Sequence, residues 1–177
     1  MKNIFKSIAL ATITVAAISC GDNKKSTETV HDHATTTTET TEQAPVETME
    51  VTTSIELEGD DNMKFNKTAF SVPVGQKVTL KLTHTGKQPI TSMGHNFVLL
   101  KKGVAAADFG QKAVTAAQTQ YIPVEEKDNV IAHTKVIGGG ESDTIEFTIE
   151  EAGEYEFLCS FPGHYGVMNG KITAVQQ

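Results

Sequence analysis

Short runs of alternating apolar and polar residues fill the chain from about residue 54 onward. Residues 78–83 (VTLKLT) and 144–149 (TIEFTI) show this period of two most clearly, and both are rich in β-branched residues. Such a period places every second side chain on one face of a strand, and β-branched residues favour strands. Gly and Pro separate the runs, as turns require. We therefore expect short strands at residues 63–65, 69–72, 78–83, 96–100, 130–136, 144–149, 155–159 and 170–175.

One segment departs from this pattern. Residues 104–118 are rich in Ala and poor in β-branched residues, which favours a helix. Strands at this spacing, interrupted by one helix, predict an all-β domain, a Greek-key β-sandwich or barrel with one short helical flap. We expect this domain to cover residues 51–177, which is enough chain to bury a single hydrophobic core.

The N-terminal residues carry a different signal. Two lysines precede an apolar run at residues 8–18, which Ser19 and Cys20 follow directly. This pattern is typical of a signal peptide, because spanning a bilayer takes roughly 20 apolar residues. A cysteine at this point resembles the lipobox of bacterial lipoproteins, although Ala17 stands where Leu is usual. We interpret residues 1–19 as a lipoprotein signal peptide and Cys20 as the lipidated residue; an ordinary secretory signal is the alternative.

A polar stretch then leads to the domain. It is rich in Thr and Glu and nearly free of large apolar side chains, so residues 20–50 are predicted to be a disordered tether. A flexible coil of this length spans about 30 Å. His31 and His33 lie in this stretch. They are either two solvated histidines, which we favour, or a weak secondary metal site.

Charge and cysteine content exclude some classes of protein. The formal net charge is −7 and the chain contains no Arg, so it lacks the basic footprint of a nucleic-acid-binding protein. The two cysteines, Cys20 and Cys159, lie in very different contexts. A disulfide between them is not expected, and each cysteine needs its own explanation.

The most informative segment is CSFPGHYGVM, residues 159–168. It begins at the end of a predicted strand, and its Pro-Gly pair predicts a tight turn. That turn would bring together the thiol of Cys159, the imidazole of His164 and the thioether of Met168. Two imidazoles and one thiolate in a plane, with a long axial Met, define a blue-copper electron-transfer site.

The loop supplies only one of the two imidazoles. The second must come from His84, His95 or His133. His95 is the best choice, because it follows Gly94 at the start of a predicted strand, and a glycine there lets its carbonyl approach the metal closely. From spacing alone, two alternatives stay open: a zinc site, which needs a fourth strong ligand, and no metal at all, with the thiol and thioether as core groups.

Four motifs in the chain resemble azurins, the type 1 blue-copper members of the cupredoxin family. Residues 159–168 resemble the azurin copper loop, and MGHNFVL at residues 93–99 resembles the azurin segment around the other copper-binding histidine. DNMKFN at residues 61–66 and AHTKVIGGGESD at residues 132–143 also resemble azurin segments. The likeness covers about residues 55–175. It implies a cupredoxin-like fold, one type 1 copper per chain, and electron transfer rather than enzymatic catalysis.

The resemblance also implies a role for each site residue. His95, Cys159 and His164 match the three strong copper ligands, Met168 matches the weak axial ligand, and the carbonyl of Gly94 matches the group on the opposite side of the copper.

Residues around the ligands can be matched in the same way. Asn96 matches a residue that ties the two ligand-bearing loops together, and the backbone N–H groups of Asn96 and Phe161 are expected to point at the thiolate. His84 matches a partly buried histidine whose protonation can couple to redox state; a satisfied core histidine is the equal alternative. In azurins the second loop histidine is exposed within an apolar docking patch, which here corresponds to Met63, Met93, Phe161, Pro162, Gly163 and Val167.

Two features depart from the azurin pattern. Azurins usually carry a disulfide near the start of the barrel, but Thr53 and residues 75–76 occupy those positions here. The buried Trp of many azurins corresponds to Phe97, and the chain contains no Trp. We therefore expect stability to come from the core and the bound metal.

Taken together, these patterns predict a blue-copper electron carrier in the bacterial cell envelope, periplasmic or surface-facing and lipid-anchored to a membrane through Cys20. The resemblance implies redox partners such as c-type cytochromes or a terminal reductase or peroxidase, with no nucleic acid and no small-molecule substrate. A copper storage or delivery lipoprotein is the alternative. A multicopper enzyme is disfavoured, because the domain shows only one complete ligand set.

Overall fold

The computed structural model describes residues 49–177. The predicted signal peptide, Cys20, His31 and His33 lie outside the described residues, as does all but the end of the predicted tether. All described residues belong to one unit of the chain, residues 45–177.

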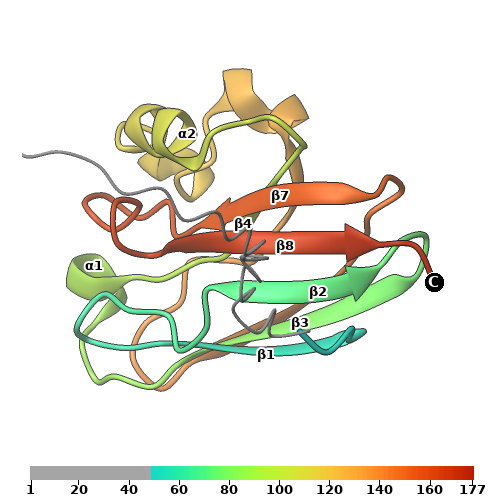
Figure 1. Ribbon diagram of the computed structural model, residues 1–177. Helices are drawn as coiled ribbons and strands as arrows, with labels where there is room; N and C mark the ends of the chain where they lie inside the picture. The colour runs from blue at the N-terminus through green and yellow to red at the C-terminus, as the bar shows by residue number, and fades with distance from the viewer. Residues whose placement is uncertain (1–48) are drawn as a thin grey trace, which may run out of the picture. The chain divides into compact units, whose positions relative to one another are not determined.

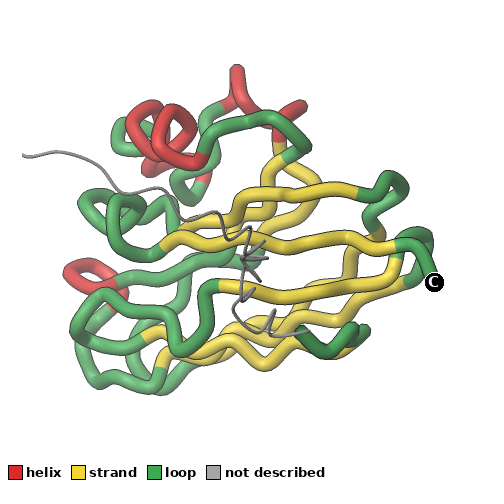
Figure 2. Tube along the Cα trace, viewed as in Figure 1, coloured by secondary structure: helices red, strands yellow, loops and turns green. Residues whose placement is uncertain are grey.

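Two β-sheets face each other across the core (Figures 1 and 2). The first has the order β1-β3-β6, from β1 (Ser54–Gly59), β3 (Lys77–His84) and β6 (Ser142–Thr148). The second has the order β2-β8-β7-β4-β5, from β2 (Ala69–Pro73), β8 (Asn169–Val175), β7 (Gly153–Leu158), β4 (Val98–Leu100) and β5 (Val130–His133). The pairs β1·β3 and β2·β8 are parallel and the other strand pairs are antiparallel. This arrangement confirms the predicted Greek-key sandwich.

The alternating pattern explains how the strands pack. In β3 the side chains of Val78, Leu80 and Leu82 are fully buried, while Lys77 and Lys81, at alternate positions, face solvent. A period of two sends alternate residues to opposite faces, so one face of the strand joins the core. Because each sheet contributes one such face, the core forms as a layer between the two sheets.

Phe97 occupies the centre of this core. Its ring is fully buried, with centroids 5.2 Å from the ring of Phe157 and 6.4 Å from that of Phe147. Tilted and offset aromatic pairs of this kind add to the stabilisation from burial itself. Aromatic packing across the two sheets therefore occupies the place where azurins carry Trp.

The helix α2 lies at one side of the second sheet, above β7 in Figure 1, and α1 lies apart from it at one end of the two sheets. The predicted helix at residues 104–118 is present but shorter: α2 spans Ala106–Ala113 and the 3₁₀ helix η1 spans Ala117–Thr119. Gln120 and Tyr121 follow with φ values of 55° and 62°, which end the helical path. No sequence pattern predicted the short helix α1 (Ile90–Met93) or the 3₁₀ helix η2 (Val124–Asn129).

A second, smaller apolar cluster lies beneath α2. Phe109 and Ala113 from the helix pack with Val98, Leu100 and Leu158 from the sheet. These strand residues point away from the main core, so the second sheet buries apolar side chains on both of its faces. Within residues 49–177, no helix is long and apolar enough to cross a membrane.

The expected strand at residues 63–65 is wrong. Met63 has a φ of 57°, and Phe65 makes only an isolated bridge to Gly59. The carboxylate of Asp60 accepts hydrogen bonds from two backbone N–H groups of this segment, at 2.9 and 3.1 Å. Such side-chain bonds compete with strand pairing and favour a turn. The strand of this region is β1, which lies earlier in the chain, in the alternating sequence SIELEG, for which we named no strand.

Two other expected strands are shorter than their sequences indicated. The strand expected at residues 96–100 begins only at Val98, because the N–H of Phe97 donates to the Thr134 hydroxyl, 2.9 Å away, in place of a ladder partner. The strand expected at residues 130–136 ends at His133. Both shortened ends lie beside the segment that carries His95, described below.

An ion pair joins the helical segments. Lys112 of α2 donates to one carboxylate oxygen of Glu126, which is the only buried acidic residue among those described, and Asn129 donates to the other oxygen at 2.6 Å. The Lys112 bond, followed by the Asn129 bond, lowers the pKa of the Glu126 carboxyl. This pair connects α2 to η2.

We predict that Glu126→Gln destabilises the domain at pH 7 and that the difference from wild type shrinks as the pH falls below about 4.3. The folded-state pKa lies below the unfolded one, so the stabilisation is complete above the unfolded pKa and disappears as the pH falls through the folded value. Urea unfolding between pH 3 and 7 measures this. Glu150→Gln, at an exposed position, is the control. A constant difference across this range would contradict the prediction.

Candidate metal centre

The loop between β7 and β8 is folded back on itself. Cys159 follows the last residue of β7 and Met168 precedes the first residue of β8, and the N–H of Cys159 donates to the carbonyl of Met168 at 2.8 Å. The carbonyl of His164 accepts from the N–H of Met168, also at 2.8 Å. Gly163 has a φ of 85°, which a residue with a side chain rarely adopts. The turn at Pro162 and Gly163 therefore directs His164 toward Cys159.

His95 reaches the same place from a separate segment. Its N–H and C=O both pair with Ile137, at 2.9 and 2.8 Å. Its Nε2 lies 2.9 Å from the carbonyl of Asp60. A carbonyl only accepts, so Nε2 carries the proton and Nδ1 presents its lone pair. A hydrogen bond of this kind to a backbone carbonyl is a common way to orient a metal-binding histidine.

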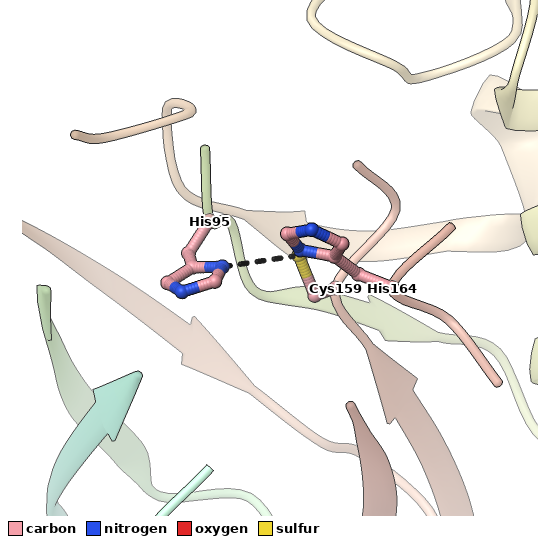
Figure 3. A group of neighbouring side chains, drawn as sticks. All are labelled: His95, Cys159 and His164. Atoms are coloured by element: carbon pink, nitrogen blue, oxygen red, sulfur yellow. Dashed lines mark hydrogen bonds between the residues drawn. The ribbon is translucent and has the colours of Figure 1, made fainter. Parts of the chain in front are cut away.

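The three side chains converge at one point (Figure 3). Sγ of Cys159 lies 3.7 Å from Nδ1 of His164 and 4.0 Å from Nδ1 of His95. A first-row metal ion in a trigonal plane, with bonds of about 2.0 Å to nitrogen and 2.3 Å to sulfur, separates these atoms by about 3.8 Å. All three residues are buried. Both the donor types and their spacing therefore fit a copper ion.

Gly94 and Met168 complete the surroundings. The carbonyl oxygen of Gly94 lies 3.9 Å from Sγ of Cys159. Met168 is fully buried, and its terminal methyl and the His95 ring both pack against Gly59. A Cβ at Gly94 would lie 2.7 Å from the ring of Phe161 and from a methyl of Val136. A glycine is therefore required for this backbone to approach the thiol.

Gly59 is a site residue that sequence reasoning missed. A Cβ there would lie 2.8 Å from the His95 ring and 3.3 Å from the terminal methyl of Met168. The end of β1 therefore packs against two of the candidate ligands, His95 and Met168. Nothing in the sequence around Gly59 marks this contact, because it joins segments far apart in the chain.

Burial makes the metal-free donors neutral. It raises the pKa of the Cys159 thiol to about 11, while backbone N–H groups of Asn96 and Phe161 directed at the sulfur act in the opposite direction. Burial also lowers the pKa of His164 to about 4 and lowers that of His95. Near neutral pH the imidazoles are free of competing protons, and a bound metal displaces one proton from the thiol.

Asn96 joins the two segments that carry the donors. Its side-chain oxygen accepts from the N–H of Ser160 at 2.8 Å, and its side-chain nitrogen donates to the Ser160 hydroxyl at 2.8 Å. Asn96 follows His95 and Ser160 follows Cys159 in the chain. These two buried bonds therefore fix the distance between the candidate ligands.

His84 lies behind His95 and does not reach the thiol. It is fully buried, with its ring stacked on His95 at a centroid distance of 4.3 Å. The N–H of Gly86 donates to Nδ1, and Nε2 lies 2.8 Å from the carbonyl of Met93, so Nε2 carries the proton. His84 is thus buried, hydrogen-bonded through both ring nitrogens and packed against His95, while coupling of its protonation to redox state stays a prediction. His133 is exposed.

The residues of the expected docking patch differ widely in exposure. Val167 is 60% exposed and Met63 37%, while Phe161 is only 8% exposed and His164 only 3%. The Phe161 ring packs on His164 and on Tyr121, with centroids 4.8 and 5.2 Å away. Met93, Pro162 and Gly163 are partly or fully exposed. His164 is therefore less exposed than the resemblance implied, and Phe161 is a buried residue of the patch.

Sequence comparison agrees with this fold and donor set, which define a cupredoxin. Residues 49–175 match the model of the copper binding proteins of the plastocyanin/azurin family. The chain belongs to this family, and it binds one copper ion per chain.

Among individual relatives, the chain is similar to azurins and to other members of the family. The chain is 42% identical over 124 residues to azurin from Alcaligenes faecalis, covering 67% of this chain and 94% of that protein. It is 44% identical over 124 residues to Outer membrane protein H.8 from Neisseria meningitidis, but this match spans only 66% of that relative's length. Among solved structures, reduced auracyanin from Roseiflexus castenholzii matches with a TM-score of 0.64 and 34% identity, over 71% of this chain and 99% of that one.

We predict that Asn96→Ala destabilises the metal-free domain by about 1–3 kcal/mol, because it leaves the buried polar groups of Ser160 without partners. Urea unfolding measures this. Asn66→Ala is the matched control, since it removes one solvent-exposed hydrogen bond, to the N–H of Glu58. Equal costs for the two variants would contradict the role given to Asn96.

Proposed function

We propose that this chain is a blue-copper electron carrier that shuttles single electrons between redox proteins of the bacterial cell envelope. His95, Cys159 and His164 would be the strong copper ligands, Met168 would be a weak ligand, and the carbonyl of Gly94 would lie close to the metal. The observation that carries the proposal is the convergence of one thiol and two imidazoles, all buried and within 4.8 Å of one another. When bound, the copper supplies the redox couple.

Rigid support of the ligands favours electron transfer over substrate chemistry. Asp60 orients His95, Asn96 ties together the two ligand segments, and Gly59 packs against His95 and Met168. Ligands held in this way move little when the charge on the metal changes. The N–H groups of Asn96 and Phe161 directed at Sγ of Cys159 stabilise negative charge on sulfur. The copper is expected to be shielded from water, as a carrier requires.

The route for electrons is proposed to be His164, whose loop also carries the exposed Val167. Met63 and Val167 give this end of the domain exposed apolar surface. Weak redox encounters bury little surface, and apolar contact without many fixed polar bonds allows partners to separate quickly. We propose c-type cytochromes or a terminal reductase or peroxidase as partners.

The location is proposed to be the cell envelope, with a lipid anchor on Cys20. The sequence pattern at residues 8–20 supports this, and so does the relative named Outer membrane protein H.8. A tether that spans about 30 Å would let the domain reach partners at or near the same membrane.

Copper storage or delivery is the second candidate, for which the anchor and the histidines at positions 31 and 33 give slight support. Burial of all three donors argues against it, because ready exchange of the metal needs accessible ligands. Reversible reduction by a cytochrome without loss of copper supports the carrier. Rapid transfer of copper to a chelator supports delivery.

We predict that the copper-loaded, oxidised wild-type protein has an intense blue band with one copper per chain and that Cys159→Ser abolishes the band. The thiolate supplies the charge transfer that gives such sites their colour, and a serine hydroxyl does not replace it. Visible spectra with a metal count measure both. Ser54→Ala, at an exposed position of β1, is the control and should remain blue. An intense blue band in Cys159→Ser, or a colourless wild type, would contradict the proposal.

We predict that Val167→Asp slows electron exchange with a c-type cytochrome by about tenfold, because a charge in the docking patch must be desolvated on contact. Val124→Asp is the matched control, since Val124 is 64% exposed and Val167 60%. Stopped-flow mixing at fixed ionic strength measures the rate. Similar slowing in both variants would show that overall charge, and not the patch, sets the rate.

A further inference from the structure

Tyr165 occupies a special place in the ligand loop, between His164 and Met168. Its ring is partly buried and packs against the second apolar cluster, beneath α2. Its neighbours in the loop, Phe161 and Met168, belong to the main core between the sheets. The loop is therefore anchored in both cores, and Tyr165 makes the second anchor.

The ring lies directly on the backbone of α2. A Cβ at Gly110 would lie 2.3 Å from Cγ of Tyr165, 2.6 Å from its Cβ and 2.7 Å from its Cδ2. Real Cβ atoms do not approach other atoms so closely, so any larger residue at this position must displace the ring or the helix. Gly110 is buried in the middle of an eight-residue helix. Glycine disfavours a helix interior, so the sequence keeps a poor helix former at the point of contact.

The contact bears on the turn that carries the two ligands. The carbonyl of His164 accepts hydrogen bonds from the N–H groups of Val167 and Met168, at 3.0 and 2.8 Å. The carbonyl of Tyr165 accepts from the side chain of Asn169 at 2.8 Å. These bonds define a compact turn from residue 164 to residue 169, but each lies within the turn itself. Tyr165 is the residue through which this turn contacts α2.

We propose that Tyr165, seated on Gly110, is a positioning residue that holds the turn carrying His164 and Met168 in place before copper binds. The helical flap then serves the metal centre, in addition to covering one face of the second sheet. The proposal rests on the proposed function only for the ligand roles of His164 and Met168.

A double-mutant cycle in the metal-free, full-length protein tests the contact. Gly110→Ala in wild type is expected to speed hydrogen exchange at the N–H groups of Val167 and Met168 by about tenfold, since the displaced ring releases the turn. In the Tyr165→Gly background, where every clashing atom is absent, Gly110→Ala should change exchange little. The added backbone freedom of Gly at position 165 is present on both sides of that comparison and cancels.

Two control variants separate positioning from loss of stability. Tyr165→Phe keeps the ring on Gly110 and should exchange like wild type. Ile122→Val removes a methyl group from another residue of the same apolar cluster and leaves the contact between Tyr165 and Gly110 in place, so it should lower overall stability without speeding exchange at Val167 and Met168 more than elsewhere. If Gly110→Ala fails to fold, Tyr165→Ala decides, because it removes the ring, leaves α2 intact and does not add the backbone freedom of glycine; it should speed exchange at the same two groups. Unchanged exchange in either variant, or equal effects of Gly110→Ala in both backgrounds, overturns the proposal.

The copper-loaded protein supplies a second readout. Gly110→Ala should shift the reduction potential and the electron paramagnetic resonance hyperfine splitting, whereas Ile122→Val should leave both unchanged. Wild-type values of both in Gly110→Ala overturn the proposal. A wild-type protein without blue colour would instead contradict the proposed function, and the metal-free exchange data would still decide whether Tyr165 positions the turn.

Discussion

The metal centre depends on the thiol of Cys159, which is buried in surroundings that oppose its ionisation. Burial raises the pKa of Cys159 to about 11, so a thiolate at this point must be stabilised by something other than water. The protein supplies two backbone N–H groups directed at the sulfur, and two neutral imidazoles lie within 4.0 Å of it. This combination stabilises negative sulfur only weakly until a cation joins it. A copper ion would stabilise the thiolate, because it shares charge with a soft sulfur ligand and accepts nitrogen lone pairs.

The two-sheet fold brings these donors together at one end. Cys159 and Met168 flank a loop between two hydrogen-bonded neighbours, β7 and β8, so the pairing of those strands fixes the span of the loop. His95 arrives from a segment that pairs with Ile137, and Asn96 fastens it to Ser160. The positions of the ligands are thus supported by backbone pairing and buried amide bonds that involve none of the ligand atoms. This explains how a chain without the usual azurin disulfide can still hold a preformed site.

Sequence reasoning located the donors but not their supports. Cys159, His164 and Met168 lie close together in the chain, so their spacing carried the prediction. The position of His95 after Gly94, at a predicted strand start, selected it as the second imidazole, and the motif resemblance agreed. Gly59 and Gly110 gave no signal, because each is required by a contact with a residue more than thirty positions away. The strand expected at residues 63–65 failed for a related reason: the carboxylate of Asp60 folds that segment into a turn whose purpose, orienting His95, is visible only in three dimensions. Alternation along the chain predicted the sheets because it depends on neighbours alone.

Under the proposed function, the small exposure of His164 sets how a partner must bind. Only 3% of this residue reaches solvent, whereas Val167 beside it is 60% exposed. A partner therefore first contacts the exposed apolar residues around His164, such as Val167. Removing water from these residues brings the partner close to the edge of the His164 ring. The net charge of −7 can attract a basic partner from a distance, but long-range attraction does not select a face. Specific docking then depends on these exposed apolar residues. They favour contact and leave few polar bonds to break when the partner dissociates.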